Sequence, residues 1–367
     1  MVVKIGSSTL VGKDRVLRRD FIAGLAAQAR ELYEMGWRLV VVSSGAIACG
    51  APKLGFSSKP ADMPSLQACA SVGQCILSAA YDEEFRAAGI LTSLVLLTRH
   101  DTARRSSYLH ARDALKRLVG LSVVPVVNEN DTVTVDEIRF GDNDTLAALV
   151  SCLVSADLCV TLSDIDGLYT ANPMEDPTAT LIPEVDRIDA SIIGAAGDSS
   201  TAVGTGGMIT KIRASRILMT AGIASVICSG AEERPLTRLA AGERLGTRFV
   251  PPADRDEIAP RKLWIALGDS AHGALEVDEG AARALMRHGS SLLPVGIRHV
   301  EGSFSAGDIL DVRDQAGLVI ARGIAQAGSD ELELAAGRRQ DEIAGNRLLA
   351  GLAGKPAIHR DDLIVFA

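Results

Sequence analysis

The feature that most constrains the fold is an alternation of short β-rich runs with helical patterns over the first 245 or so residues. The β-rich runs are short and apolar, as Val40-Val41-Val42 shows. This alternation is typical of βαβ units, in which parallel strands are joined by helices that cover both faces of a sheet. We therefore predict an α/β domain with a mostly parallel sheet. Besides a first strand at the start of the chain, we expect strands at 38–43, 91–98, 122–128, 158–163 and 224–229, and helices at 20–35, 65–88, 105–118, 144–154 and 211–221.

The sequence changes character after about residue 250. Residues 250–260 are rich in Pro, Asp and Glu, which is typical of a linker. Short apolar runs separated by turn glycines follow, and we expect strands at 263–267, 275–277, 309–312 and 318–325. The pattern predicts a first domain at 1–252, a linker at 253–260 and a smaller, mainly β domain at 261–367.

A glycine cluster leads directly into a helical pattern at residues 204–211, which read Gly-Thr-Gly-Gly-Met-Ile-Thr-Lys. Glycine lets a backbone approach a phosphate closely, the first N–H groups of a helix are unpaired, and Lys211 adds a full positive charge. The spacing fits neither the Walker A motif nor the dinucleotide-binding fingerprint. The stretch indicates a phosphate-binding loop of another kind, and an ordinary surface loop before a helix is the alternative.

A second lysine, Lys4, lies in the apolar run that opens the chain, which we expect to be a strand of the buried sheet. A buried ammonium group is costly unless it is paired or binds an anion. The run ends in Gly6-Ser7-Ser8, at the edge where open α/β sheets bind ligands. Two lysines beside glycine turns suit a reaction in which negative charge develops on a phosphoryl group. An edge-strand lysine that reaches water is the alternative.

Three more polar clusters follow predicted strands. Residues 43–45, Ser-Ser-Gly, lead into a helix and offer hydroxyl and N–H groups to a carboxylate or phosphate, unless they only cap the helix. Residues 128–131 (Asn-Glu-Asn-Asp) and 141–144 (Gly-Asp-Asn-Asp) suit an ammonium group, a lysine or a metal, although turn and capping chemistry explains many such residues. Residues 163–170 offer hydroxyl and carboxylate groups to a nucleotide.

Charge argues against a nucleic-acid-binding protein. The formal net charge is −8, and residues 260–367 also hold more Asp and Glu than Lys and Arg, whereas nucleic-acid binders usually present a basic face. The most apolar long segment, 146–162, is interrupted by two serines and an aspartate, so we expect no membrane span. Six cysteines without C-x-x-C spacing, and the lack of a recognisable signal peptide, favour a cytoplasmic protein.

Taken together, the motifs resemble those of the glutamate 5-kinases of the amino acid kinase family. In chain order they are Val-Val-Lys-Ile-Gly-Ser-Ser at 2–8, Ser-Ser-Gly-Ala-Ile-Ala at 43–48, Val-Asn-Glu-Asn-Asp at 127–131, Phe-Gly-Asp-Asn-Asp at 140–144, Ser-Asp-Ile-Asp-Gly-Leu-Tyr-Thr at 163–170 and Gly-Thr-Gly-Gly-Met at 204–208. The second domain resembles a PUA domain through Val-Asp-Glu-Gly-Ala at 277–281 and Gly-Ser-Ser-Leu-Leu-Pro at 289–294. Each motif alone is weak, but six in one order over almost the whole chain are specific.

The resemblance implies the amino acid kinase fold followed by a PUA-like domain. It implies ATP-dependent phosphorylation of the γ-carboxylate of L-glutamate to L-glutamyl 5-phosphate, the first step of proline biosynthesis. By the same resemblance, Lys4 and Lys211 stabilise the transferred phosphoryl group and Asp144 orients them. Glutamate would be held by Ser44, Asp131 and Asn143. The nucleotide would contact Lys4, Ser163, Asp164, Thr205, Gly206, Gly207, Met208, Ile209, Thr210 and Lys211; at position 163, serine stands where threonine is expected.

The resemblance also implies ATP and Mg²⁺ as cofactors, with the ion held largely by phosphates and no dedicated metal site in the protein. It implies L-proline as a feedback inhibitor, a homo-oligomer (dimer or tetramer) and glutamate-5-semialdehyde dehydrogenase as the downstream enzyme. Two alternatives stay open. One is a sibling kinase of the same fold that phosphorylates N-acetylglutamate, aspartate, UMP or carbamate; the other is an RNA-binding or RNA-modifying PUA protein, which the acidic charge disfavours.

Overall fold

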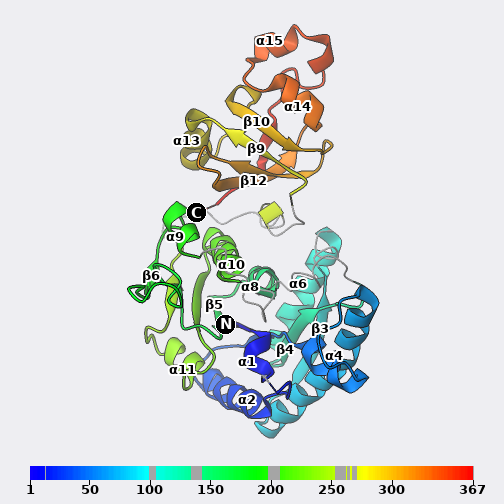
Figure 1. Cartoon of the computed structure of the whole chain (residues 1–367), viewed down its shortest axis with the longest axis vertical. Coiled ribbons are helices and arrows are strands. Elements are labelled where there is room, and N and C mark those ends of the chain that lie inside the picture. The colour runs from blue at the N-terminus through cyan, green and yellow to red at the C-terminus, as the bar shows by residue number, and fades with distance from the viewer. Residues whose placement is uncertain are drawn as a thin grey trace. The chain divides into compact units, whose positions relative to one another are not determined.

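The chain forms two compact units, Met1–Pro252 and Ala253–Ala367, each with its own hydrophobic core (Figure 1). The structure, a computed structural model, describes residues 1–12, 14–98, 105–133, 143–196, 207–252, 262, 265–266 and 271–366. The segment 253–260, which we predicted to be a linker, lies outside these described residues.

The first unit is built on an eight-stranded sheet with the strand order β3-β4-β2-β1-β5-β7-β8-β6. Neighbouring strands from β3 to β7 are parallel, and β8 is antiparallel to β7. The predicted α/β class with a mostly parallel sheet is thus confirmed. The strands are β1 (Val2–Ile5), β2 (Val40–Val42), β3 (Thr92–Leu97), β4 (Val124–Glu129), β5 (Leu158–Ser163), β6 (Glu184–Val185), β7 (Ala224–Ser229) and β8 (Thr247–Phe249).

Strand β1 lies at the centre of this sheet. It pairs with β2 on one side and β5 on the other, so that Lys4 lies between Val42 and Thr161. From β1 the chain passes to β2 on one side and later to β5 on the other, which makes β1 a point where the strand order reverses. Ligands of open α/β sheets bind at the carboxyl ends of strands at such a point. The sheet topology therefore places Lys4 where ligand binding is expected.

Helices cover both faces of the sheet (Figure 1). Helices α2 and α4 pack on the face that presents Val3 and Ile5, and α8 and α10 contact the strands on the opposite face, toward which Lys4 points. The longer helices are α2 (Arg19–Glu34), α4 (Met63–Ala87), α6 (Arg105–Gly120), α8 (Asn143–Val154) and α10 (Met208–Thr220). The shorter ones are α1 (Ser7–Leu10), α3 (Ala46–Gly50), η1 (Pro52–Leu54), α9 (Ala190–Ala195) and α11 (Pro235–Ala240).

Two glycines bring α3 and α4 into backbone contact. A Cβ atom on Gly73 would lie 1.7 Å from the carbonyl oxygen of Ala46, and one on Gly50 would lie 1.9 Å from that of Cys69. No side chain fits at either position. The turn before α3 also requires glycine, because Gly45 has a φ of +90°. These contacts fix the start of α3, which directly follows the segment 43–45, against the middle of α4.

The second unit contains a five-stranded sheet with the order β10-β9-β11-β12-β13, in which only β9 and β11 are parallel neighbours. Asp278, in the 277–281 motif, caps α13 by accepting a hydrogen bond from the N–H of Ala281 at 2.7 Å. The elements are β9 (Gly273–Val277), α13 (Glu279–His288), η2 (Pro294–Gly296), β10 (Ile297–Gly302), β11 (Ile309–Arg313), β12 (Val319–Ala325), α14 (Ser329–Ala335), α15 (Gln340–Ala344), η3 (Arg347–Leu349) and β13 (Ile358–Val365).

The prediction of a strand at 263–267 is wrong for the two of these residues that the structure describes. Ile265 and Ala266 are helical, and both are buried. A short apolar run is compatible with a buried helix as well as a strand, because periodicity alone does not separate them. The sequence patterns also missed β6, β8, β10 and β13. The first two are very short, and β13 carries consecutive charged residues at 360–362 that hide its strand pattern. None of the described helices is long and apolar enough to cross a membrane.

Candidate active site

Two lysines converge on one buried carboxylate at the carboxyl end of β1. The Nζ atom of Lys4 lies 2.7 Å from Oδ1 of Asp144, and Nζ of Lys211 lies 3.5 Å from Oδ2 of the same carboxylate. The side chains of Lys4, Lys211 and Asp144 are 8%, 6% and 1% exposed. They come from β1, the first turn of α10 and the first turn of α8. The topology thus assembles a compact group with a net positive charge from three segments that are far apart in sequence.

The electrostatics of this group follow from its burial. Burial alone would raise the pKa of Asp144, but the charges of Lys4 and Lys211 and hydrogen bonds from Lys4 and Thr210 outweigh it and lower this pKa to about 2. Burial lowers the pKa of Lys211, against the opposing attraction of Asp144, and the charge of Lys4 lowers it further. The carboxylate is therefore ionised at neutral pH and compensates part of the positive charge of the two lysines.

Two helices direct their amino termini at the lysine group. Asp144 lies in the first turn of α8, where a negative charge is stabilised by the helix dipole. At the start of α10, Gly207 is the N-cap residue and has no side chain that could cap the helix. In the first turn of the same helix, the hydroxyl of Thr210 donates to Oδ2 of Asp144 at 2.7 Å. Thr210, which we predicted to contact the nucleotide, therefore also helps to hold Asp144.

A second polar cluster adjoins the first, because Asn143 directly precedes Asp144. The Nδ2 group of Asn143 lies 2.8 Å from the carbonyl oxygen of Ser43, 2.8 Å from Oγ of Ser44 and 3.1 Å from Oδ1 of Asn128. Asn143, Ser44 and Asn128 are all buried. The carboxyl ends of β2 and β4 and the start of α8 thus meet in one network of neutral hydrogen-bonding groups.

This network extends into α4 through Gln74, a residue that the sequence analysis did not single out. The Nδ2 group of Asn128 donates to Oε1 of Gln74 at 2.8 Å. The Nε2 group of Gln74 is buried and has no hydrogen-bond partner among the residues that the structure describes. A buried, unpaired amide of this kind costs about 1–3 kcal/mol. One sequence signal was present: Gln74 interrupts an apolar helical stripe that includes Ala70 and Leu77.

The other predicted site residues are placed as follows. Ser163 ends β5, next to β1, and its hydroxyl donates to Oδ1 of Asp164 at 3.0 Å. Asp131 lies in the turn after β4 and is partly exposed. Gly207, Met208 and Ile209 form the partly buried start of α10, and Thr205 and Gly206 lie outside the described residues. The structure therefore brings together Lys4, Lys211, Asp144 and Thr210 in one group and Ser44 and Asn143 in its neighbour.

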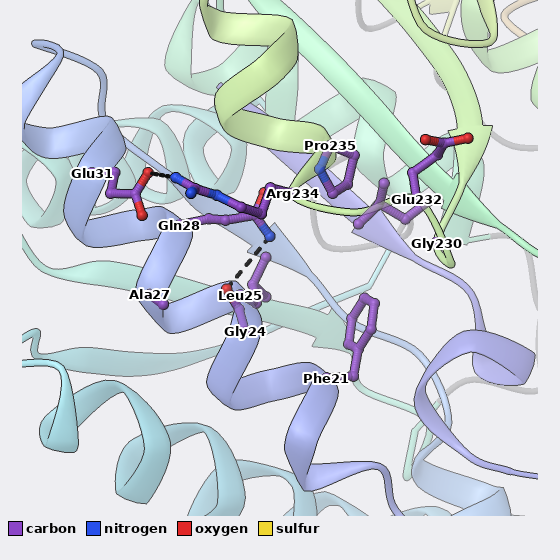
Figure 2. A pocket seen from close by; sticks show the side chains of 11 residues that line it. Phe21, Gly24, Leu25, Ala27, Gln28, Glu31, Gly230, Glu232, Arg234 and Pro235 are labelled. Atoms are coloured by element: carbon purple, nitrogen blue, oxygen red, sulfur yellow. Dashed lines mark hydrogen bonds and ion pairs between the residues drawn. The ribbon is translucent and has the colours of Figure 1, made fainter.

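A cavity of about 420 Å³ lies apart from these two clusters, between α2 and the segment that leads into α11 (Figure 2). Phe21, Leu25 and Pro235 form its apolar wall, and an ion pair between Glu31 and Arg234 borders it. None of the predicted site residues that the structure describes lines it. The remaining lining residues are Gly24, Ala27, Gln28, Leu162, Gly230 and Glu232.

The described residues contain no group of three or more His, Cys, Asp or Glu side chains that could hold a metal ion. At the lysine group, both carboxylate oxygens of Asp144 already contact ammonium or hydroxyl groups. Two buried cations suit anionic oxygens, such as those of phosphates, better than a metal ion.

The chain is similar to proteins of known families. Residues 1–229 match the model of the amino acid kinase family, and residues 273–345 match that of the PUA domain. A protein of Citrifermentans bemidjiense named glutamate 5-kinase is 45% identical over 100% of this chain and 97% of its own length. One of Chromohalobacter salexigens with the same name is 46% identical over 100% of this chain and 95% of its own. A solved structure of isopentenyl phosphate kinase, 19% identical, covers 68% of this chain and 99% of its own at a TM-score of 0.46.

The match of residues 1–229 to the amino acid kinase family model defines the class of protein as a kinase. The chain belongs to the amino acid kinase family, and within it to the glutamate 5-kinases, with a PUA domain after the kinase domain.

Proposed function

We propose that this enzyme transfers the γ-phosphoryl group of ATP to the γ-carboxylate of L-glutamate, giving L-glutamyl 5-phosphate and ADP. The observation that carries the proposal is the adjacency of Asn143 and Asp144. One belongs to the neutral amide network and the other to the cationic group. An acceptor bound by the first would lie beside the charges that stabilise a phosphoryl group in transfer. Relatives named glutamate 5-kinase over the full length of the chain support this choice of acceptor.

The residues would act mainly by positioning and charge neutralisation. The γ-carboxylate of glutamate is ionised at neutral pH and is itself the nucleophile, so no general base is needed. Lys4 and Lys211 would stabilise the negative charge on the phosphoryl oxygens, and Asp144 would hold both ammonium groups in place before the nucleotide binds. Ser44, Asn143 and Asp131 would bind the amino acid. Ser163, Asp164 and the residues from Thr205 to Lys211 would contact the nucleotide.

Mg²⁺ would accompany ATP as a charge-neutralising ion. Such ions commonly bind one or two carboxylates, several waters and the substrate phosphates rather than an all-protein cage. The protein's own contribution is the pair of ammonium groups, which lie at the carboxyl end of β1 on the side of α8 and α10. These residues would bind and orient the phosphates.

A substrate panel tests the acceptor. ADP release is measured with Mg-ATP and, in separate reactions, glutamate, N-acetylglutamate, aspartate, UMP and carbamate. We expect clear turnover with glutamate and little with the rest. A preference for another acceptor would place the chain's activity with a sibling of the same family, and no turnover with any acceptor, together with tight RNA binding, would favour an RNA-directed role.

We further propose that L-proline, the product of the pathway that this reaction would open, inhibits the enzyme by competing with glutamate. Proline shares the α-carboxylate and a cationic nitrogen with glutamate but lacks the γ-carboxylate nucleophile. The groups proposed to bind the amino-acid end of glutamate suit both ligands. Raising the glutamate concentration should relieve the inhibition. Equal inhibition at low and saturating glutamate would show that the two sites do not overlap.

Three further properties belong to this proposal: a homo-oligomer, either dimer or tetramer; a cytoplasmic location; and a downstream glutamate-5-semialdehyde dehydrogenase that consumes the acyl phosphate. Sedimentation velocity of the purified chain tests the first. A monomer at micromolar concentration, fully active, would contradict it.

A further inference from the structure

We propose that Gln74 is a positioning residue for the acceptor site, one that sets the orientation of Asn143 through Asn128. The inference rests on the proposed function, because it assigns Asn143 to the binding of the acceptor. The residue acts without touching the substrate. Its contribution is to fix which end of each amide in the network donates and which end accepts.

The direction of the network follows from one backbone group. The N–H of Glu129 donates to Oδ1 of Asn128 at 2.9 Å, which fixes the acceptor end of that amide. The Nδ2 end of Asn128 must then point the other way, where it donates to Oε1 of Gln74 at 2.8 Å. Oδ1 of Asn128 is left to accept from Nδ2 of Asn143 at 3.1 Å. Because the Nδ2 end of Asn143 is used within the protein, its Oδ1 end is the one that would meet the acceptor.

The unpaired end of Gln74 agrees with this role. Its Nε2 group is buried and has no hydrogen-bond partner among the described residues, yet a reversal of the Gln74 amide would set two NH₂ groups against each other. Unpaired buried polar groups in proteins need an explanation, and they are often kept for function at a cost in stability. Since Nε2 is inaccessible to solvent in this structure, direct contact with a substrate does not explain it.

The part of α4 around Gln74 packs closely against the 43–46 segment. Gln74 follows Gly73, whose backbone contact with Ala46 brings α4 against the start of α3. Tyr81 lies on the same helical stripe, two turns further along α4, and its hydroxyl oxygen is 3.2 Å from Oγ of Ser43. Helix α4 therefore contacts the 43–45 turn through Tyr81 and the Asn128–Asn143 pair through Gln74.

The experiment compares Gln74→Met with Gln74→Glu in the full-length protein. Methionine keeps the size and removes the acceptor, whereas glutamate keeps an acceptor where Oε1 lies. We expect Gln74→Met to raise the KM for L-glutamate about tenfold while kcat and the KM for ATP change less than about threefold. Its melting temperature should stay close to that of wild type, because the substitution removes the unpaired Nε2 group but leaves Nδ2 of Asn128 without its acceptor. Gln74→Glu should keep the KM for glutamate within about threefold of wild type.

A matched control and a double variant complete the test. Leu77→Met, one turn along the same buried stripe, should leave both KM values unchanged. If Gln74 acts through Asn143, adding Gln74→Met to Asn143→Ala should change the KM for glutamate less than about twofold.

Several results would overturn the inference. Gln74→Met could leave the KM for glutamate unchanged, or it could be unfolded or clearly less stable than wild type. Gln74→Glu could have the same KM for glutamate as Gln74→Met, or the effects of Gln74→Met and Asn143→Ala on this KM could add in the double variant. Failure of the proposed function would look different, since wild type itself would then turn over no glutamate. If wild type prefers another acceptor, the same comparison is made with the KM for that acceptor.

Discussion

The Oδ1 atom of Asp144 lies 2.7 Å from Nζ of Lys4, so the carboxylate at the start of α8 is paired with an ammonium group in the middle of the sheet. Lys211 approaches the other oxygen of the same carboxylate. Two buried cations would repel each other without this anion. The arrangement holds the two lysine side chains close together at one anion, where both can meet an anionic phosphoryl group.

Replacing either lysine should reduce turnover far more than substrate binding. We expect Lys4→Ala and Lys211→Ala each to lower kcat roughly a hundredfold or more, because each loses a preorganised positive charge where phosphoryl charge develops. Steady-state kinetics with glutamate and ATP measure this. Lys59→Ala, at an exposed position in the same unit, serves as the control and should leave kcat and both KM values unchanged. A folded Lys4→Ala or Lys211→Ala protein with normal kcat would remove that lysine from the mechanism.

Asp144→Asn should lower both stability and activity. The variant leaves two buried ammonium groups without their counter-charge, and breaking a buried ion pair typically costs about 3–5 kcal/mol. Chemical denaturation of Met1–Pro252 measures the loss, and Asp20→Asn, on the exposed face of α2, should stay within about 0.5 kcal/mol of wild type. An Asp144→Asn protein as stable as wild type would show that the ion pairs contribute nothing to the fold.

The low pKa of Asp144 also predicts a dependence of stability on acid pH. Its value of about 2 in the folded chain lies below the ordinary value of about 4, so the unfolded chain binds the proton more readily. The stabilisation from this carboxylate is therefore present above about pH 4 and is lost as the pH falls toward 2. Denaturation curves of wild type and Asp144→Asn should converge over that interval. A constant difference between them down to pH 2 would contradict the assignment.

Lys211 should set the alkaline limit of activity. Burial lowers its pKa in the free enzyme, so it loses its charge at a lower pH than an ordinary lysine would. The value of kcat/KM for ATP reports ionisations of the free enzyme and should fall on the alkaline side accordingly. Lys211→Arg, if active, should move that fall to higher pH, because a guanidinium stays protonated. Identical alkaline profiles in the two proteins would assign the limit to another group.

Asn143→Ala should chiefly raise the KM for glutamate, by roughly tenfold, because it removes one neutral side chain that contacts Ser44 and Asn128. The KM for ATP should change little. Asn172→Ala, in an exposed loop, provides the matched control. If the effect of Asn143→Ala falls on ATP alone, the acceptor site lies elsewhere.

A chain that ends at Pro252 should fold and keep its kinase activity, because Met1–Pro252 has its own hydrophobic core and contains every predicted site residue. Circular dichroism and the ADP-release assay test this together. A soluble, folded truncation with no activity would mean that the PUA domain is needed for catalysis.

The sequence by itself predicted the parts of this protein whose signals are local. The largely apolar run 158–163 predicted a buried strand, and the bounds of β5 agree with that prediction. Lys4 and Lys211 stood out because each is a charge beside glycines in an otherwise apolar or helical pattern. Resemblance, rather than spacing, linked them to Asp144.

Only the tertiary structure decided which side chains share a site and how their hydrogen bonds run. Sheet order brings β1, α8 and α10 together, and no local pattern encodes that Lys4 lies 2.7 Å from Asp144. The same holds for Gln74, a polar residue in an apolar stripe of α4, whose partner Asn128 belongs to strand β4. Its importance depends on a network across three elements. The physical reason is that propensity and hydrophobic periodicity act between neighbours in the chain, whereas burial, pKa shifts and the direction of hydrogen bonds depend on what the fold places beside each group.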